Sequence, residues 1–355
     1  MRIVAVEEHF TCQHLLSRID SVTLVRNGWP APGTTTFNAI NPPALSDTGR
    51  ERIAAMDAAG IRMQVLSVPG PGAEIVPGPE GIAIAREFNN RMAQLISAEP
   101  ERFAGFAHLP MRSASAAADE LERAVVECGL KGALISGTID GQFLDAPEFA
   151  PVLARAERLD VPLYIHPGVP PKGVRDAYYD RLPGEASFML AIAGWGWHAE
   201  VAVHILRLAL SGTLDRHPRL KLLIGHMGEC LPTMMDRVER VFSSYSRTHL
   251  DRNAARAIVE QVWVSTSGFS STPAFLAAFM TFGADRILFS VDYPFGNNLA
   301  AVAFLENLPV SPEDREKIAH QNADALLRLI SERDVRAVAG PPVSASESTA
   351  HQGQR

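Results

Sequence analysis

Short apolar runs alternate with amphipathic segments along most of this chain, and this alternation limits the folds open to it. Eight of the runs are short, and most of them contain β-branched residues and are bounded by Gly, Pro or Asp, as buried parallel strands usually are. These predicted strands are Ile3–Val6, Met63–Val68, Phe103–His108, Gly132–Ser136, Pro162–His166, Leu220–Gly225, Val262–Thr266 and Ile287–Val291. Segments with helical spacing of apolar residues lie between them, at 81–98, 114–127, 147–159, 198–211, 230–242 and 272–282. The pattern predicts an α/β protein built on parallel strands.

Eight strands that alternate with helices admit two architectures, a (β/α)8 TIM barrel and an open doubly wound sheet. Neither G-x-G-x-x-G nor a P-loop motif follows the first strand, which removes the usual reason to prefer the open sheet. The strand count and the length of 355 residues favour the barrel. We expect one barrel domain over residues 1–333 and a disordered tail over 334–355, where large apolar residues are scarce.

Two stretches interrupt the alternation. Residues 20–46 are rich in Pro, Gly, Asn and Thr and are predicted to form a long loop after the first strand. Residues 168–197 form an insertion after the fifth strand. Loops that follow barrel strands lie on the catalytic face, so both insertions, with the Pro/Gly-rich loop 68–73, are predicted to line a substrate pocket. The alternative is that they only shield the mouth of the barrel.

Composition excludes several classes of protein. The chain has 33 Lys and Arg against 40 Asp and Glu, and this net charge of -7 argues against a nucleic-acid or anionic-membrane partner. Its 3 cysteines lie far apart without a C-x-x-C pair, so neither a disulfide framework nor a thiolate zinc site is expected. The N-terminus lacks the pattern of a signal peptide, and the most apolar stretches, around 186–197 and 273–284, are interrupted by Gly. We expect a soluble cytoplasmic enzyme.

Metal-binding residue types gather at the ends of the predicted strands. Glu7 and His9 follow the first strand two residues apart, so alternation directs both side chains the same way. His166, His226 and Asp292 follow the fifth, sixth and eighth strands. The carboxyl ends of parallel barrel strands meet on one face, where a barrel builds its active site. These five side chains are therefore predicted to lie close together.

Each of these signals is weak alone. A His after an apolar strand is more often a hydrogen-bonded structural residue, and an Asp in that place is often only a helix cap. Their conjunction at four strand ends favours a metal centre instead. Mixed His and carboxylate ligands suit Zn or Mn, and the two metals are not distinguished by ligand type.

The chain resembles the amidohydrolase-2 branch of the amidohydrolase superfamily over roughly residues 1–333. The resemblance lies in four motifs, Glu7-x-His9, His166-Pro167, Gly225-His226-Met227-Gly228-Glu229 and Asp292-Tyr293-Pro294-Phe295. Within that branch the chain is most similar to the nonoxidative decarboxylases of γ-resorcylate, 2,3-dihydroxybenzoate, 5-carboxyvanillate and aminocarboxymuconate semialdehyde. The resemblance implies a barrel with one divalent metal ion per subunit.

The same resemblance implies roles for particular residues. The ligands would be Glu7, His9, His166 and Asp292, and His226 would lie beside them in a polar dyad with Glu229. Glu229 has an alternative reading, as a carboxylate favoured by the dipole at a helix start. Binuclear amidohydrolases carry a bridging Lys at the end of strand four, but this chain has Ser136-Gly137 there and its nearest Lys begins that strand. A mononuclear site is expected.

The implied reaction is nonoxidative decarboxylation of a hydroxylated aromatic carboxylic acid. The ring carbon must accept a proton before CO2 leaves, and the resemblance assigns this proton to Asp292. Phe10 and Trp197 are candidates to stack on the ring, although core packing is the ordinary role of a buried aromatic residue. The resemblance also implies a homodimer or homotetramer in which Arg237 reaches the pocket of the neighbouring subunit. The alternative for Arg237 is a solvated place on its helix.

Two other functions remain open at the level of the sequence. A metal-dependent hydrolase of a lactone or related cyclic ester would use the same ligands to activate water, with Asp292 as the base. The second is a binding scaffold, a barrel that has lost its catalytic activity. Such a scaffold has no physical need for the retained ligands. Release of CO2 from hydroxybenzoates separates the decarboxylase from both.

Overall fold

The eight predicted strands are present, and one of them is interrupted. The computed structural model describes residues 1–329, so the predicted tail at 334–355 lies outside the described residues. All strand pairs are parallel and follow chain order, in one sheet of β1-β2-β3 and another from β4 to β9. The strands are β1 (Val4–His9), β2 (Met63–Ser67), β3 (Phe103–Gly105), β4 (Ala107–His108), β5 (Ala133–Ser136), β6 (Leu163–His166), β7 (Leu222–Ile224), β8 (Val262–Ser265) and β9 (Ile287–Leu288).

The two sheets join into one ring at both of their ends. β3 and β4 are parts of one extended segment, broken only at Phe106, whose N–H donates to the carbonyl of Leu66 over 2.9 Å. On the other side, Val6 N–H donates to the Phe289 carbonyl over 3.1 Å, and Glu8 forms a parallel bridge with Tyr293. The ring of eight strands confirms the predicted (β/α)8 barrel.

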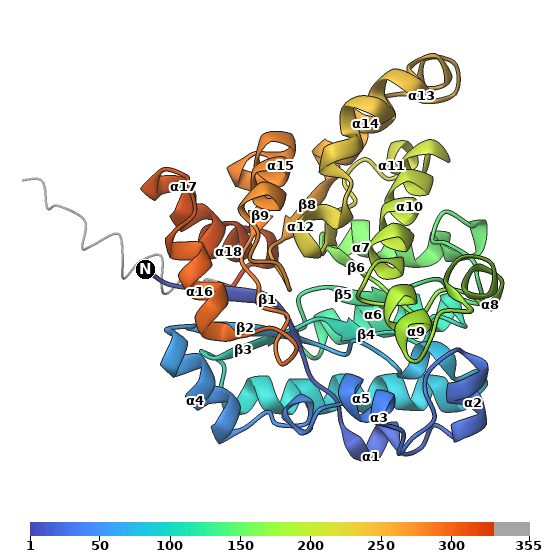
Figure 1. The fold of residues 1–355 in the computed structure, drawn as a ribbon, viewed down its shortest axis with the longest axis vertical. Helices are drawn as coiled ribbons and strands as arrows, with labels where there is room; N and C mark the ends of the chain where they lie inside the picture. Colours follow the sequence, from blue (N-terminus) through green and yellow to red (C-terminus); the bar gives the residue numbers. More distant parts are fainter. Residues whose placement is uncertain (330–355) are drawn as a thin grey trace, which may run out of the picture.

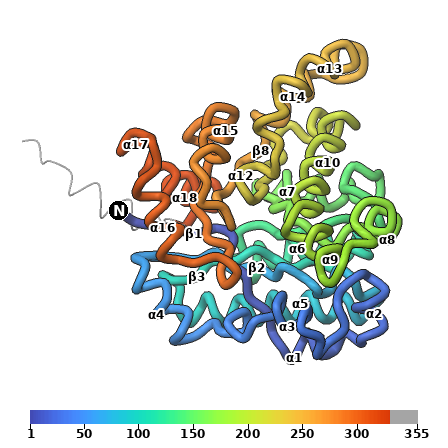
Figure 2. Tube along the Cα trace, in the orientation of Figure 1, coloured from blue at the N-terminus to red at the C-terminus, as the bar shows by residue number. Residues whose placement is uncertain are grey.

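Helices surround the strands on their outer face (Figure 1). They are α1 (Gln13–Leu16), α2 (Ser21–Arg26), α3 (Thr35–Ile40), α4 (Arg50–Ala59), α5 (Gly78–Ala98), α6 (Ala114–Val126), α7 (Ala150–Leu159), α8 (Lys172–Val174), α9 (Ala186–Ala191), α10 (Gly196–Leu210), α11 (Thr213–Arg216), α12 (His226–Glu229), α13 (Met235–His249), α14 (Ala254–Gln261), α15 (Thr272–Phe282), α16 (Asn298–Glu306), α17 (Pro312–Glu316) and α18 (Asn322–Leu327). The helix predicted at 230–242 is instead a 3-10 turn at Pro232–Met234 followed by α13, which projects from the rest of the molecule in Figures 1 and 2.

The barrel has an inner and an outer apolar core. Side chains from alternate strand positions fill the interior, and Ala323, Leu326 and Leu327 of α18 pack against the same cluster. A second, larger cluster lies between the strands and the surrounding helices. Because α18 covers the end where the strands begin, the opposite end, where the strands finish, is left for the active site.

A bulge in β1 changes which side chains point into the barrel. Val4 and Val6 belong to the inner cluster, whereas Ala5 packs on the outer one. The register with β2 then shifts between Ala5 and Glu8. Simple alternation from Val6 would direct the next residue, Glu7, outward; the shift instead turns Glu7 toward the barrel axis.

The insertions predicted as loops contain short helices. In 20–46, the Asp20 side chain accepts a hydrogen bond from Thr23 N–H and begins α2, and the Thr34 hydroxyl accepts one from Phe37 N–H and begins α3. The prediction of one long loop was therefore wrong, because capping side chains within the polar sequence start helices there. The insertion at 168–197 similarly contains α8, a π-helical turn at Arg175–Tyr179, and α9.

The stretch Ala186–Leu210 is long and apolar enough to cross a membrane, judged by length and composition only. In the structure it consists of α9 and α10, separated by a break at 192–195. Val201, Ile205 and Leu208 of α10 are buried against the barrel. This burial is typical of a core helix in a globular protein, which passes the same test.

Candidate active site

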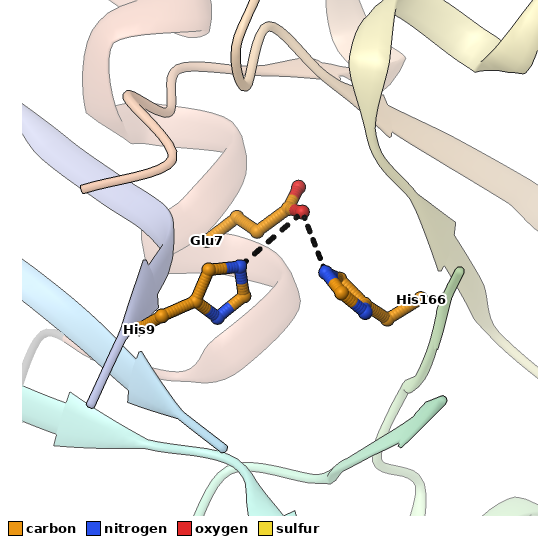
Figure 3. A group of neighbouring side chains, drawn as sticks. All are labelled: Glu7, His9 and His166. Atoms are coloured by element: carbon orange, nitrogen blue, oxygen red, sulfur yellow. Dashed lines mark ion pairs between the residues drawn. The ribbon is translucent and has the colours of Figure 1, made fainter. Parts of the chain in front are cut away.

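Glu7, His9 and His166 converge at the carboxyl ends of β1 and β6. Glu7 Oε1 lies 3.8 Å from His9 Nε2 and 3.5 Å from His166 Nε2. Figure 3 shows the Glu7 carboxylate pointing between the two imidazole rings. The three ligand atoms lie within 4.8 Å of one another, and all three residues are buried. The structure therefore brings together three of the four predicted metal ligands as one cluster.

Hydrogen bonds fix the orientation of both imidazole rings. His166 Nδ1 lies 2.8 Å from the Pro167 carbonyl, which only accepts, so Nδ1 carries the proton and Nε2 keeps its lone pair. His9 Nδ1 lies 3.0 Å from Ser67 Oγ, which allows the same tautomer. Burial, with repulsion from His9 and His226, lowers the pKa of His166 to about 3. The imidazole of His166 is therefore neutral at physiological pH, as a metal ligand must be.

The second oxygen of Glu7 is held by hydroxyl groups of the barrel interior. Glu7 Oε2 accepts hydrogen bonds from Tyr164, from Ser267, and from Ser265 over 3.1 Å. Burial and the neighbouring charge of Glu7 raise the pKa of Tyr164 well above its usual value, so the phenol remains a donor. These three donors fix the carboxylate and leave Oε1 free to face the two histidines.

The cluster fits a divalent metal ion. Glu7 Oε1 and His9 Nε2 are buried and have no hydrogen-bond partner among residues 1–329. A buried acceptor without a partner costs free energy, and two such atoms that face each other are accounted for by a shared cation. No Lys of the described residues belongs to the cluster: Lys131, at the start of β5, directs its Nζ toward the Arg328 carbonyl at the other end of the barrel. The expectation of a single ion stays a prediction.

Asp292 lies between His9 and His226 at the edge of the cluster. Its Oδ1 is 3.2 Å from His9 Nε2, and its Oδ2 is 3.7 Å from His226 Nε2. Burial would raise the pKa of Asp292, but the neighbouring imidazole rings of His226 and His9 outweigh burial and lower it. Asp292 also has a φ of 70°, in the left-handed region that L-residues adopt infrequently.

Glu8 holds the backbone on both sides of Asp292. Its carboxylate accepts hydrogen bonds from Val291 N–H over 2.8 Å and from Tyr293 N–H over 3.1 Å. Asp292 N–H donates to the Glu7 carbonyl over 3.1 Å. Glu8, which lies between Glu7 and His9 in the sequence, thus closes the seam of the barrel and fixes the unusual backbone of Asp292, the fourth predicted ligand.

Glu229 joins two histidines rather than one. Its Oε1 lies 2.7 Å from His226 Nδ1, which is the predicted dyad, and its Oε2 lies 2.6 Å from His198 Nδ1. Burial would raise the pKa of Glu229, but the charge of His226 and the hydrogen bond from His198 lower it to about 2. Burial would lower the pKa of His226, yet the charges of Glu229 and Glu7 raise it well above its usual value.

The backbone around the dyad is not a regular helix start. His226, Met227 and Glu229 all have φ between 52° and 57°, and Gly228 has a φ of 87°. Glu229 is therefore not simply a carboxylate in the first turn of a helix. The turn has left-handed backbone angles, which direct the side chains of His226 and Glu229 toward each other.

The three predicted substrate-binding residues have different surroundings. Phe10 is 1% exposed and packs edge-on against Phe88 in the outer core, so the structure favours the alternative of core packing for it. Trp197 lies beside the cluster, with its ring centroid 6.4 Å from that of His166. Arg237 is exposed on α13, which projects away from the barrel, and it has no part in the site of its own chain.

Several residues of the site were missed by sequence reasoning. Tyr164 had a usable signal, because it lies two residues before His166, which ends β6 and also faces inward, and Ser265 is itself the last residue of β8. His198 had none, since it lies in a helix after the insertion, and no local pattern indicates that it meets Glu229. Alternation along β1 directs Glu8 away from its neighbours Glu7 and His9, but no local pattern indicates its contacts with Val291 and Tyr293.

Known proteins are similar to this chain over most of its length. The family model described as amidohydrolase matches residues 36–329. The γ-resorcylate decarboxylase of Rhizobium radiobacter is 37% identical over 338 residues, which covers 92% of this chain and 98% of the relative. Both matches extend over most of the described barrel.

Solved structures agree with the sequence relatives. The 2,6-dihydroxybenzoate decarboxylase from Rhizobium is 35% identical, with a TM-score of 0.80 over 93% of this chain and 99% of that one. The dihydroxybenzoic acid decarboxylase from Polaromonas sp. JS666, solved with manganese and the inhibitor 2-nitroresorcinol, is 32% identical, with a TM-score of 0.77 over 94% of this chain and 99% of that one. The chain therefore belongs to the amidohydrolase family, in the amidohydrolase-2 branch indicated by its strand-end motifs.

Proposed function

We propose that this protein is a metal-dependent nonoxidative decarboxylase, a carboxy-lyase, that acts on a hydroxylated aromatic carboxylic acid. The observation that carries the proposal is the convergence of Glu7 Oε1 and His9 Nε2, both buried and without a partner among the described residues, with His166 Nε2. Asp292 and His226 adjoin this cluster as a pair of acid–base groups. The decarboxylases among its relatives support the reaction class.

One divalent ion per chain would be held by Glu7, His9, His166 and Asp292. When bound, such an ion would supply a chelating centre for the carboxylate and the ortho hydroxyl group of the substrate and would favour the phenolate. Neutral imidazole and carboxylate ligands accept either manganese or zinc. The bound manganese of the Polaromonas relative supports manganese.

The residues of the chain supply the proton that the reaction needs. Asp292 donates a proton to the ring carbon that carries the carboxylate. The carbon–carbon bond then breaks, its electron pair returns to the ring, and CO2 leaves. His226 Nε2 is 3.7 Å from Asp292 Oδ2, so a small approach of the two groups on substrate binding would let His226 pass a proton to Asp292. Glu229 holds the His226 ring in place through Nδ1.

We also propose that the protein assembles as a homodimer or homotetramer. Met234, Val241 and Tyr245 are exposed on α13 and the turn before it, on the arm that projects from the barrel. Exposed apolar groups on a projecting element favour contact with a second copy of the chain. Light scattering at several protein concentrations tests this, and a monomer throughout would contradict it. Location in the cytoplasm remains a prediction.

The reaction class is tested by incubating purified protein with a series of hydroxybenzoates and following CO2, with elemental analysis of the same sample. We expect CO2 from at least one ortho-hydroxylated acid, in proportion to metal content. Hydrolysis of lactones without release of CO2 from any hydroxybenzoate would contradict the proposal.

A further inference from the structure

The first turns of α10 distribute three side chains over the mouth of the barrel. His198 turns toward Glu229, and Trp197 lies beside the ring of His166. Glu200, three residues after Trp197, faces the ends of β5 and β6. Residues three apart in a helix share one face, so Trp197 and Glu200 lie on the side of α10 that adjoins His166.

Trp197 and Glu200 both carry a buried polar atom without a partner. Trp197 Nε1 and Glu200 Oε1 make no hydrogen bond within the part of the chain that the structure describes. Most buried polar groups in folded proteins are hydrogen-bonded, and an exception needs an explanation. The pair consists of one donor and one acceptor, on one face of one helix, beside a metal ligand.

Two glycines place Glu200 next to the active site. Gly137 N–H donates to the His166 carbonyl over 2.8 Å, and a side chain at Gly137 would lie 3.1 Å from Glu200 Oε1. The same side chain would collide with the backbone of Gly168. The carboxyl group of Glu200 therefore lies next to Gly137, whose backbone pairs with that of His166. Gly137 and Gly168 also line a cavity of about 280 Å³.

We propose that Glu200 and Trp197 form a polar subsite that recognises a second hydroxyl group on the aromatic ring of the substrate. The proposal rests on the function proposed above and adds the feature that separates one hydroxybenzoate from another. A hydroxyl group donates and accepts at once, so it can pair with both the carboxyl oxygen and the indole N–H. A methyl group pairs with neither, and a methoxy group only accepts.

The charge of Glu200 is compatible with an anionic substrate. Burial raises its pKa to about 8, so the group is largely a neutral carboxylic acid at pH 7. Tyr179 of the insertion is the titratable neighbour, and burial followed by the charge of Glu200 raises the pKa of Tyr179 as well. A neutral carboxyl group does not repel the substrate carboxylate, and it can still accept a hydrogen bond from a hydroxyl group.

The test compares two substrates that differ in one group, 2,6-dihydroxybenzoate and 2-hydroxy-6-methylbenzoate. The measured quantity is the ratio of their kcat/KM values in the wild type, Glu200→Leu and Glu200→Gln, with metal content and thermal midpoint of each protein. Glu127→Gln, at an exposed position after α6, is the matched control. We expect Glu200→Leu to lower the preference for the hydroxylated substrate at least tenfold, because a site built to pair a hydroxyl group rejects the analogue without it.

Further results are expected from the same proteins. Glu200→Gln should retain part of the preference, because an amide oxygen still accepts. The control should retain all of it, and metal content should be unchanged throughout. Glu200→Leu should have an equal or higher thermal midpoint, since it removes a buried carboxyl group that has no partner in the fold.

Three outcomes would overturn the proposal: an unchanged ratio in Glu200→Leu, an equal loss for both substrates, or a variant that fails to fold because Glu200 is structural. Failure of the proposed function is distinguishable, because the metal-loaded wild type would then release CO2 from neither acid. In that case the affinities of the same two acids are measured by calorimetry with wild type and with Glu200→Gln. The same ratio of the two affinities in both proteins would reject the subsite.

Discussion

Replacing His198 by Phe tests whether the second histidine on Glu229 contributes to catalysis. Phe keeps the edge-on packing of the ring against Phe269, whose centroid is 5.6 Å away, and removes both ring nitrogens. The 2.6 Å contact between His198 Nδ1 and Glu229 Oε2 is then lost. Hydrogen bonds to a charged group contribute about 1.5–3 kcal/mol. If that free energy serves to hold Glu229 against His226, kcat should fall by about 10- to 150-fold.

The assay is steady-state CO2 release with metal content measured in the same sample. Because His198 has no contact with the three clustered ligands, metal content and KM should change little. His204→Phe is the control: His204 is buried on the same helix and accepts a hydrogen bond from Leu144 N–H over 3.0 Å, far from Glu229. The control should lose stability but keep kcat.

A double-mutant cycle with Glu229→Gln isolates the coupling between the two residues. With the carboxylate gone, His198 has little left to position, so the second substitution should add far less than the first. Unchanged kcat in a folded, metal-loaded His198→Phe protein would refute the reasoning. Strict additivity of the two substitutions would refute it as well.

Four further predictions follow from the site. His166→Ala should lose metal and turnover together, as elemental analysis and CO2 release would show, and full metal content with wild-type activity would remove His166 from the ligand set. Asp292→Asn should lose several orders of magnitude in kcat with only a partial loss of metal, because an amide cannot donate the carboxylic proton. Burial raises the pKa of Glu200 from 4.5 to about 8. Between these pH values the folded state therefore binds a proton that the unfolded chain releases, so the contribution of Glu200 to the free energy of unfolding falls as the pH rises from 4.5 to 8. Relative to Glu200→Gln, wild type should therefore lose at most about 5 kcal/mol between these pH values in denaturant titrations, and a constant difference would contradict this. Mixing Arg237→Ala with His166→Ala under subunit exchange should restore some activity if Arg237 reaches a partner's pocket, and no recovery despite exchange would place each site within one barrel.

The carboxyl ends of the strands were predictable because they depend on local pattern. Short β-branched runs bounded by turn residues indicate where strands begin and finish, and the barrel rule places their ends on one face. His166 and Asp292 could be assigned to a shared site for this reason, and Glu7 with His9 by their spacing of two. The structure brings these side chains together as expected.

The surroundings of those residues depended on contacts between distant parts of the chain. Glu7 faces the barrel axis only because the pairing of β1 with β2 shifts by one bulge, and local alternation carries no information on that register. Glu8 acquires its role from Val291 and Tyr293, which lie at the other end of the barrel sequence.

The division between predicted and unpredicted features has one physical reason. Periodicity reports which side of its own element a residue faces, whereas a contact depends on how separate elements pack. Sequence alone therefore determined the barrel and the residues at its mouth, and left Phe10 open between core and pocket. Only the tertiary structure could place His198 on Glu229 and Glu200 beside Gly137, because α10 reaches those residues by packing over the ends of the strands.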